Sequence, residues 1–327
     1  MHDVNYTFFH DQEPIHLAIH KPLFDSVVIR NCDTNLGQGP LVKALIHSEK
    51  NSEAVDQVCS LYDWQPYYYF FHGWAALDWY RGYNHTWLMP DPQDRQIDST
   101  FICPNRIVAG MRNHRLVLFY YCLKLQMMSN FISFPAVCPG ENIPVKQAIK
   151  PLMSRYPDIE RVYDNKNLWL PISFSGEDNS PMHSCWLSLF TESSKCLLYV
   201  VTETLARGRR WHLTEKTFKP ICLRMPFVLV GTCGSLEYLR SYGFQTFDSL
   251  WDESYDQELD DDIRLEKIAQ LLKSLDVMSV GEKRSLFKAA QPIVQHNYEH
   301  FYGGGFEKIL WDELKIMLDN LSGNMPK

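Results

Sequence analysis

The sequence predicts an α/β protein with parallel sheets in two domains, and three observations support this fold class. Two segments, 196–204 (CLLYVVTET) and 226–232 (PFVLVGT), are continuous apolar runs of strand length, which is typical of parallel strands buried on both faces. Segments of helical length alternate with such runs. The chain of 327 residues is also long enough for two hydrophobic cores. We therefore expect two Rossmann-like domains.

The first domain is expected to span residues 1–98. Residues 24–31 (FDSVVIRN) predict a buried strand, and residues 39–50 (GPLVKALIHSEK) predict a helix after a glycine turn. The aromatic segment 62–87 predicts mostly core, with YYYFF as a strand and the tryptophans after it on a helix. The polar, proline-containing residues 89–99 are interpreted as a linker.

The second domain is expected to span residues 99–303, and a C-terminal segment, 304–327, follows it. Residues 100–106 (TFICPNR) predict the first strand of this domain. Predicted helices cover 112–128, 234–242, 262–275 and 306–320, and residues 139–180, which are rich in Pro, Asn and Asp, predict loops and short helices. We expect the helix at 306–320 to pack back across the first domain.

Composition narrows the class of protein. Hydrophobic residues make up 45% of the chain and charged residues 22%, which is ordinary for a soluble globular protein. The net charge of -7 argues against non-specific binding to nucleic acid, although a local basic patch would escape this test. The nine cysteines are scattered without a CxxC pair, which predicts reduced thiols and no zinc site. With no signal-peptide core and no apolar run that could cross a bilayer, the sequence predicts a cytoplasmic protein.

Residues 205–224 are unusually basic, with six basic side chains and one acidic one. Thr214 or Thr217 could cap a helix here, and Pro220 fits the first turn better if Thr217 is the cap. Free N–H groups at a helix start, with Lys216 and Lys219 beside them, make a site for phosphate.

Residues 205–224 are also expected to lie at one edge of the parallel sheet. Ligands of open parallel sheets bind at the carboxyl ends of the strands, which places the loops after 196–204 and 226–232 at a site. Glu215 would then accept hydrogen bonds, for example from two ribose hydroxyls. The alternative is a solvated basic face with one ion pair inside the helix.

Residues 196–231 (CLLYVVTETLARGRRWHLTEKTFKPICLRMPFVLVG) resemble the donor-binding segment of the fucosyltransferase and exostosin-like glycosyltransferases. Residues 100–125 are similar to the opening of the same domain. The resemblance covers roughly residues 100–250. A closer likeness, which includes HDQEP (10–14) and FDSLWDESYD (247–256), is to glycosyltransferase-like proteins of phages and large viruses.

The resemblance implies the two-domain GT-B arrangement and a nucleotide-diphosphate sugar as donor. It assigns Glu215 to the donor ribose and Lys216 to the diphosphate. Arg112 or Arg115 would also meet the diphosphate, and Arg112 is preferred because an Arg-Asn pair opens the matching helix in some family members. Glu203 corresponds to the glutamate before the variable loop. Thr214 and Lys219 complete the expected donor site.

The sequence departs from the family pattern at two places. Thr204 stands where an asparagine often follows the glutamate, and residues 205–212 form a long basic loop. The donor nucleotide and its sugar therefore stay open. Lysine and arginine at a helix start can neutralise a departing diphosphate without a metal. Residues 260–264 (DDDIR) contain a formal metal-binding triplet but are interpreted as a helix cap, so we expect no metal and no cofactor.

An inverting transfer needs a general base, and Glu13 is the preferred candidate, with Asp11 in reserve. Both lie in residues 8–16 (FFHDQEPIH), where a turn with capping carboxylates is the alternative. Asp63 and Asp78, which stand beside aromatic residues, are further candidates.

A few exposed rings in residues 62–87 could hold an acceptor sugar or an unstacked base, with Arg81 and His85 meeting a phosphate. A histidine pair, His296 and His300, precedes three glycines and is interpreted as part of a helix end.

The sequence thus predicts a metal-independent, inverting glycosyltransferase. The acceptor could be a hydroxymethylated base in viral DNA, in which case the protein would work in the cytoplasm of the host cell, or else a glycan or a protein. The alternative from another class is a non-catalytic module that binds a nucleotide or a glycan on a degenerate transferase fold.

Overall fold

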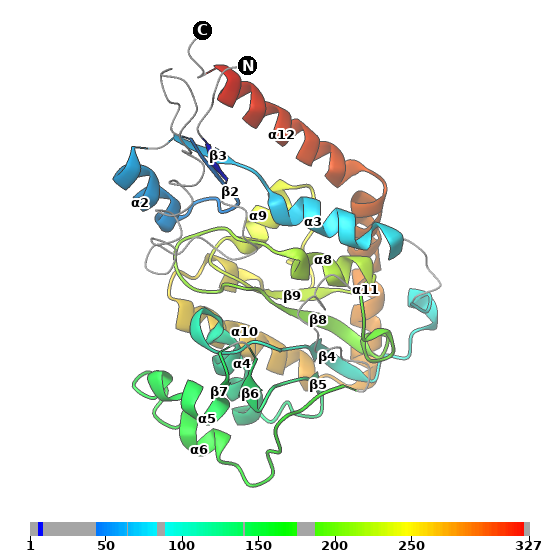
Figure 1. Cartoon of the computed structure of the whole chain (residues 1–327). Coiled ribbons are helices and arrows are strands. Elements are labelled where there is room, and N and C mark those ends of the chain that lie inside the picture. The colour runs from blue at the N-terminus through cyan, green and yellow to red at the C-terminus, as the bar shows by residue number, and fades with distance from the viewer. Residues whose placement is uncertain are drawn as a thin grey trace.

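The structure is a computed structural model that describes residues 6–8, 44–63, 65–83, 89–139, 141–174 and 187–323. It is a mixed α/β fold with two parallel sheets (Figure 1). The N-terminal sheet has the order β1-β2-β3, with β1 at Tyr6–Phe8, β2 at Ala44–His47 and β3 at Gln65–Tyr68. The predicted α/β class with parallel sheets is confirmed.

The second sheet has the order β5-β4-β8-β9, and its pairings are all parallel. Its strands are β4 (Ser99–Cys103), β5 (Phe131–Ile132), β8 (Cys196–Thr202) and β9 (Phe227–Val230). Every residue of β8 and β9 is buried. This explains why the apolar runs in the sequence were continuous, because a strand covered on both faces has no polar side.

Helices cover this sheet from several segments of the chain. α8 (Glu215–Cys222) and α11 (Val280–Tyr302) pack on β8, whereas α10 (Asp261–Asp276) packs on β4, β9 and α4 (His114–Lys124). The remaining described helices include α2 (Glu53–Tyr62), α3 (Phe71–Tyr80), α5 (Val145–Ala148), α6 (Ile159–Tyr163), α7 (Phe190–Ser193) and α9 (Ser235–Ser241).

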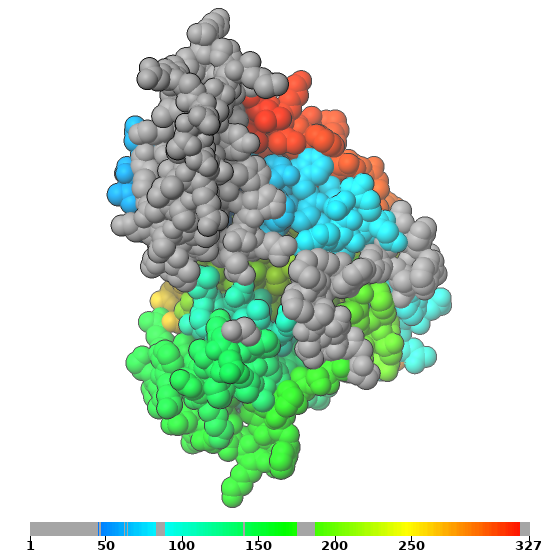
Figure 2. Space-filling view, viewed as in Figure 1, coloured from blue at the N-terminus to red at the C-terminus, as the bar shows by residue number. Residues whose placement is uncertain are grey.

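The last helix, α12 (Gly305–Gly323), returns to the N-terminal sheet and lies against β3 and α3. Figure 2 shows α3 and α12 side by side on the surface. The ring centroids of Trp74 and Trp311 are 4.6 Å apart, and Phe306, which is fully buried, packs against Phe70 at 6.3 Å. Aromatic contacts therefore hold α12 in place.

Two predictions of secondary structure need correction. Residues 39–50 were expected to form a helix, but Ala44–His47 is strand β2, which pairs with both β1 and β3. Pairing on both sides outweighs the helical pattern of so short an apolar run. The 23-residue helix α11 was predicted only at its C-terminal end.

Candidate functional site

The carboxyl ends of β4 and β8 meet beneath the start of α8 and enclose a small cavity of about 70 Å³. Four cationic side chains line this cavity, namely Arg106, Arg115, Lys216 and Lys219, and none of its described lining residues is acidic. Because the protein as a whole carries a net charge of -7, this gathering of positive charge is a local feature of the strand ends. We call it the cationic site.

Helix α8 begins at Glu215 with Thr214 as its N-cap, whose hydroxyl accepts a hydrogen bond from the backbone N–H of Lys216 at 3.4 Å. Thr217, the alternative cap, lies inside the helix and uses its hydroxyl elsewhere. Pro220 is also inside the helix rather than in its first turn. The first-turn N–H groups and the positive end of the helix dipole therefore lie beside Lys216.

Glu203, the residue after β8, is fully buried and fixes the start of α8. One carboxylate oxygen accepts from the Thr214 N–H at 3.0 Å and the Thr217 hydroxyl at 2.5 Å. The other accepts from the Thr204 N–H at 3.2 Å and the Thr214 hydroxyl at 2.5 Å. With both oxygens bonded to the protein, Glu203 positions the helix N-terminus, and its predicted contact with a donor stays a prediction.

Arg115 is buried on α4, and its guanidinium donates to three backbone carbonyls. The acceptors are Ile107 at 2.8 Å, Thr202 at 2.8 Å and Glu203 at 3.0 Å. Burial, followed by the charge of Arg112, lowers the pKa of Arg115 to about 10, so the side chain stays cationic at neutral pH. Carbonyls orient this charge without neutralising it.

Arg112 ends the short 3₁₀ helix Gly110–Arg112 just before α4 and is half-buried. Its charge acts on both Arg115 and His212. The structure therefore places Arg115 in one cavity lining with Lys216 and Lys219, although these residues are about 100 positions apart in sequence. Arg112, the arginine preferred from the sequence, is not among the lining residues.

Glu215 is buried and forms an ion pair with Lys216, with 2.8 Å between Oε1 and Nζ. Burial alone would raise the pKa of Glu215, but Lys216, His72 and Lys219 outweigh it and lower this pKa to about 2. The Lys216 ammonium also donates to the hydroxyls of Thr204 at 3.2 Å and Thr214 at 3.4 Å. Glu215 is thus an ionised acceptor at the edge of the cationic site.

Two histidines that sequence reasoning missed complete the cluster. His72, in the first turn of α3, lies with Nδ1 3.9 Å from a Glu215 oxygen, so the N-terminal unit reaches the site. Its ring stands edge-on to that of His212 with centroids 5.0 Å apart. The only sequence signal was the position of His212 two residues before the helix cap, in WHLTEK.

His212 is 1% exposed, and in the part of the chain described neither of its ring nitrogens has a hydrogen-bond partner. Burial, then the charges of His72, Lys216 and other basic side chains, hold its pKa well below 6.5. The ring is therefore neutral at pH 7, with one donor and one acceptor unused. A buried polar group in this state calls for an explanation, and a bound ligand would provide one.

Several other predicted residues lie away from the cationic site or outside the described residues. Glu13, Asp11 and His85 lie outside the described residues. Asp63 is the C-cap of α2 and is exposed. Asp78 is exposed on α3 and pairs with Arg81 at 3.8 Å.

The acidic run at 260–262 is a helix cap, as interpreted from the sequence. The Asp260 side chain accepts from the backbone N–H groups of Asp262 at 2.9 Å and Ile263 at 3.1 Å. His296 and His300 hold α11 to the loop after α9, through the carbonyls of Gly243 at 3.0 Å and Tyr242 at 2.7 Å.

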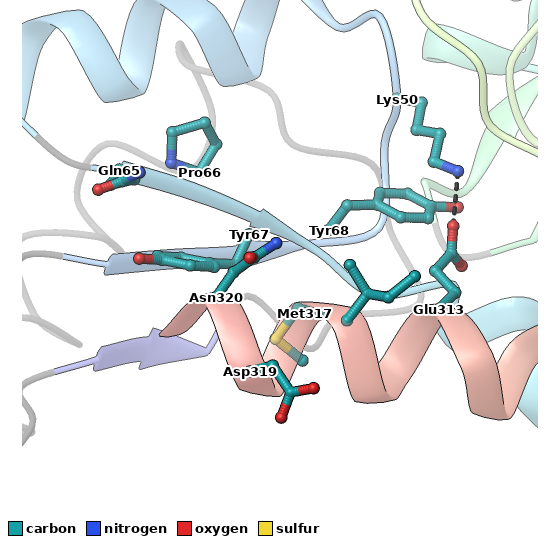
Figure 3. A pocket seen from close by; sticks show the side chains of 10 residues that line it. Lys50, Gln65, Pro66, Tyr67, Tyr68, Glu313, Met317, Asp319 and Asn320 are labelled. Atoms are coloured by element: carbon teal, nitrogen blue, oxygen red, sulfur yellow. Dashed lines mark hydrogen bonds and ion pairs between the residues drawn. The ribbon is translucent and has the colours of Figure 1, made fainter. Parts of the chain in front are cut away.

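A second cavity of about 570 Å³ lies between β3 and α12 (Figure 3). At one end the Lys50 ammonium pairs with Glu313 at 2.6 Å and bonds to the Tyr242 hydroxyl at 3.1 Å. The Tyr68 ring lies 4.2 Å from the same ammonium. With Glu313 and Asp319 in its lining, this cavity is poorly suited to a diphosphate, and its polar end ties α12 to β3 and α9.

No protein-family model, curated protein or solved structure matched the chain. Within the described residues, no helix is both long enough and apolar enough to cross a membrane. The cationic site and the residues beside it offer fixed positive charge, a helix N-terminus, one ionised carboxylate and a neutral histidine. This set of groups suits a ligand with a compact, multiply charged anion beside hydroxyl groups.

Proposed function

We propose that the protein is a metal-independent glycosyltransferase that takes its sugar from a nucleotide-diphosphate donor. One observation carries this proposal, namely the gathering of Arg106, Arg115, Lys216 and Lys219 around a cavity at the carboxyl ends of β4 and β8, beneath the start of α8. The donor would bind in the second domain, residues 99–303. The two-domain GT-B arrangement would place the acceptor against residues 1–98.

In a glycosyl transfer of this kind, the protein must stabilise the leaving diphosphate. As the acceptor hydroxyl attacks the anomeric carbon, the bond from that carbon to the diphosphate oxygen breaks, and the electron pair stays on the diphosphate. In a diphosphate bound at the cationic site, this charge would develop beside Lys216 and Lys219, and Arg115 is already oriented by carbonyls. Fixed cations of this kind lower the barrier because they need no rearrangement during the reaction.

The remaining groups fit the rest of a nucleotide. Glu215 is ionised and could accept hydrogen bonds from ribose hydroxyls, in exchange for part of its contact with Lys216. His212 could give its unused N–H to a phosphate oxygen. Glu203 would act as a positioning residue, because its oxygens already hold the start of α8.

The proton of the acceptor hydroxyl would pass to a carboxylate, with Glu13 preferred and Asp11 in reserve, and the transfer would invert the anomeric centre. The acceptor would be a hydroxymethylated base in viral DNA, a glycan or a protein. These assignments rest on the sequence and the resemblance.

A second candidate is a non-catalytic module that binds the nucleotide without turnover. It is favoured by the state of Glu203 and Glu215, the two carboxylates described beside the cationic site. Glu203 has both oxygens bonded to the protein, and Glu215 has its pKa lowered to about 2, so neither suits a general base. A transferase therefore needs a base from elsewhere in the chain.

Thermal stabilisation by a panel of nucleotide sugars and free nucleotides tests the proposal. A ligand at a hundred times its dissociation constant adds about 2.7 kcal/mol of stability. We expect one nucleotide diphosphate to stabilise the wild type and to lose most of its effect in Lys216→Ala. Lys308→Ala is the matched control, because this lysine is also in an ion pair with an acidic side chain, at 2.8 Å, but lies exposed on α12.

Binding alone does not separate the two candidates, so the nucleotide that binds is next supplied as its sugar donor. Release of the nucleoside diphosphate, by hydrolysis or transfer, supports the transferase. Binding without release supports the module. If no nucleotide stabilises the wild type, both candidates are wrong.

A further inference from the structure

A separate cavity of about 890 Å³ lies between residues 91–97 and α11. It is found at the C-terminal end of α8. Its lining includes Arg224, and Arg95 donates to the carbonyl of Leu223, the C-cap residue of this helix. The segment 89–98 runs beside α11 in Figure 1. An eight-residue helix is about 12 Å long, so this cavity and the cationic site are at opposite ends of α8.

The lining of this cavity is strongly basic for a chain with a net charge of -7. Arg95, Arg224, Arg284 and Lys288 all contribute to it, against Asp91 as its one acidic residue among those described. Like charges that gather around a hollow repel each other, and the repulsion is stronger where water is partly excluded. A bound anion would relieve it.

The pKa of Arg95 reflects this repulsion. The side chain is buried, and its guanidinium donates to the carbonyls of Pro90 at 3.2 Å, Leu223 at 2.9 Å and Arg224 at 3.1 Å. Burial, followed by the charge of Arg224, lowers the pKa of Arg95 to about 10. Arg95 therefore has a structural role at the end of α8 and still adds positive charge to the cavity.

The guanidinium of Arg224 does not use all of its N–H donors in contacts with other described residues. One terminal nitrogen donates to Gln295 at 2.8 Å, and the guanidinium lies 4.5 Å from the centre of the Tyr298 ring. Its buried Nε has no hydrogen-bond partner among the described residues. The residue also holds a left-handed backbone with φ of 52°, which is uncommon for a side chain of this size. An unpaired buried donor in a basic cavity points to an anion as its missing acceptor.

Lys288 adds a second charge without a local partner. It is exposed on α11, and no described residue forms an ion pair with it, whereas Arg284 pairs with Asp98 at 3.3 Å. Four residues later, Pro292 has no N–H, so the helix gives the Lys288 carbonyl no donor at the usual i+4 position. Phe287 supplies an apolar contribution to the same lining.

We propose that this cavity binds a small phosphorylated molecule, with Arg224 and Lys288 as the contacts to its phosphate. The cavity volume is within the range of small-molecule pockets, about 300–1,000 Å³. A phosphate monoester carries about -1.5 to -2 charges at pH 7, which matches the two cations that would contact it, whereas a single carboxylate would leave one of them uncompensated. The inference does not depend on the function of the cationic site, because the two sites share no lining residue.

Isothermal titration calorimetry with inorganic pyrophosphate and with glycerol 3-phosphate tests the inference. The full-length Lys216→Ala variant is used as the background, so that the cationic site contributes little. We expect saturable binding of at least one of these two probes, weakened at least tenfold by Arg224→Gln and by Lys288→Gln. Lys308→Gln is the control, because this lysine is exposed on α12 and does not line the cavity.

The outcomes separate this inference from the proposed function. Equal affinity in Lys288→Gln and in its background would overturn the inference even if Arg224→Gln failed to fold, because Lys288 is exposed. No saturable binding in the background would also overturn it. Citrate binding with neither phosphorylated probe bound would refute the ligand class. A nucleotide that stabilises the wild type but not Lys216→Ala would still support the cationic site in each case.

Discussion

Replacing Glu203 by glutamine is the sharpest perturbation of the site, because it keeps the shape of the side chain and removes one acceptor and the charge. Each carboxylate oxygen accepts one backbone N–H and one threonine hydroxyl. Oε1 takes the Thr214 N–H at 3.0 Å with the Thr217 hydroxyl, and Oε2 takes the Thr204 N–H at 3.2 Å with the Thr214 hydroxyl. A hydroxyl can turn and accept from the new amide, whereas a backbone N–H cannot.

Whichever oxygen becomes the amide nitrogen, one buried N–H loses its acceptor. Leaving a buried donor unpaired costs about 1–3 kcal/mol, and the bonds that remain are weaker because the acceptor is no longer charged. Arg115 also loses a nearby negative charge. Together these effects predict that the free energy of unfolding falls by about 2–4 kcal/mol.

Urea unfolding followed by tryptophan fluorescence measures this loss, with Glu266→Gln as the control. Glu266 is exposed on α10, and surface substitutions of this kind change stability by about 0.5 kcal/mol or less. If the free energy of unfolding of Glu203→Gln lies within that range of the wild type, the reasoning about Glu203 as the anchor of α8 is wrong.

Two further predictions concern pH and the core. Because the pKa of His212 is held well below 6.5 in the folded protein, only the unfolded chain takes up its proton as the pH falls below about 6.5. This costs up to about 1.4 kcal/mol of stability per pH unit. We expect His212→Asn to show a shallower loss between pH 6.5 and 5 in urea unfolding, and an unchanged slope would contradict the assignment. Phe306→Ala should lower the free energy of unfolding by about 3–5 kcal/mol, because its ring is fully buried against Phe70 and Phe218. Trp311→Ala, at a half-exposed ring on the same helix, should cost less, and equal losses would show that the packing account of α12 is wrong.

The elements that the sequence predicted well are those whose signal is local. The strands at Cys196–Thr202 and Phe227–Val230 have continuous apolar runs, because both faces of each strand are buried. The first turn of α8 is marked by a threonine cap followed by charged residues. The local sequence could not decide whether Thr214 or Thr217 caps the helix, because this depends on the position of Glu203.

The elements that were missed depend on contacts between distant segments. Ala44–His47 is a strand because β1 and β3 pair with it on both sides, and a run of four residues carries too little pattern to show this. In the site, His72 comes from a segment that no motif connects to α8, so its approach to Glu215 could not be anticipated. Arg106 lies in a segment that the resemblance does connect to α8, but nothing in the sequence singled out its side chain as part of the site.

By itself, the sequence determined the α/β class and the basic helix start at 214–219. Burial of a strand on two faces and the capping of a helix each produce a pattern in neighbouring residues. Only the tertiary structure decided that Glu203 holds that helix through its carboxylate, and that Arg115 is oriented on backbone carbonyls. It also decided that His212 lies buried with both ring nitrogens unpaired by any described residue. The physical reason is that these hydrogen bonds and this burial depend on contacts between segments that are distant in the chain. Such contacts leave no pattern in the local sequence.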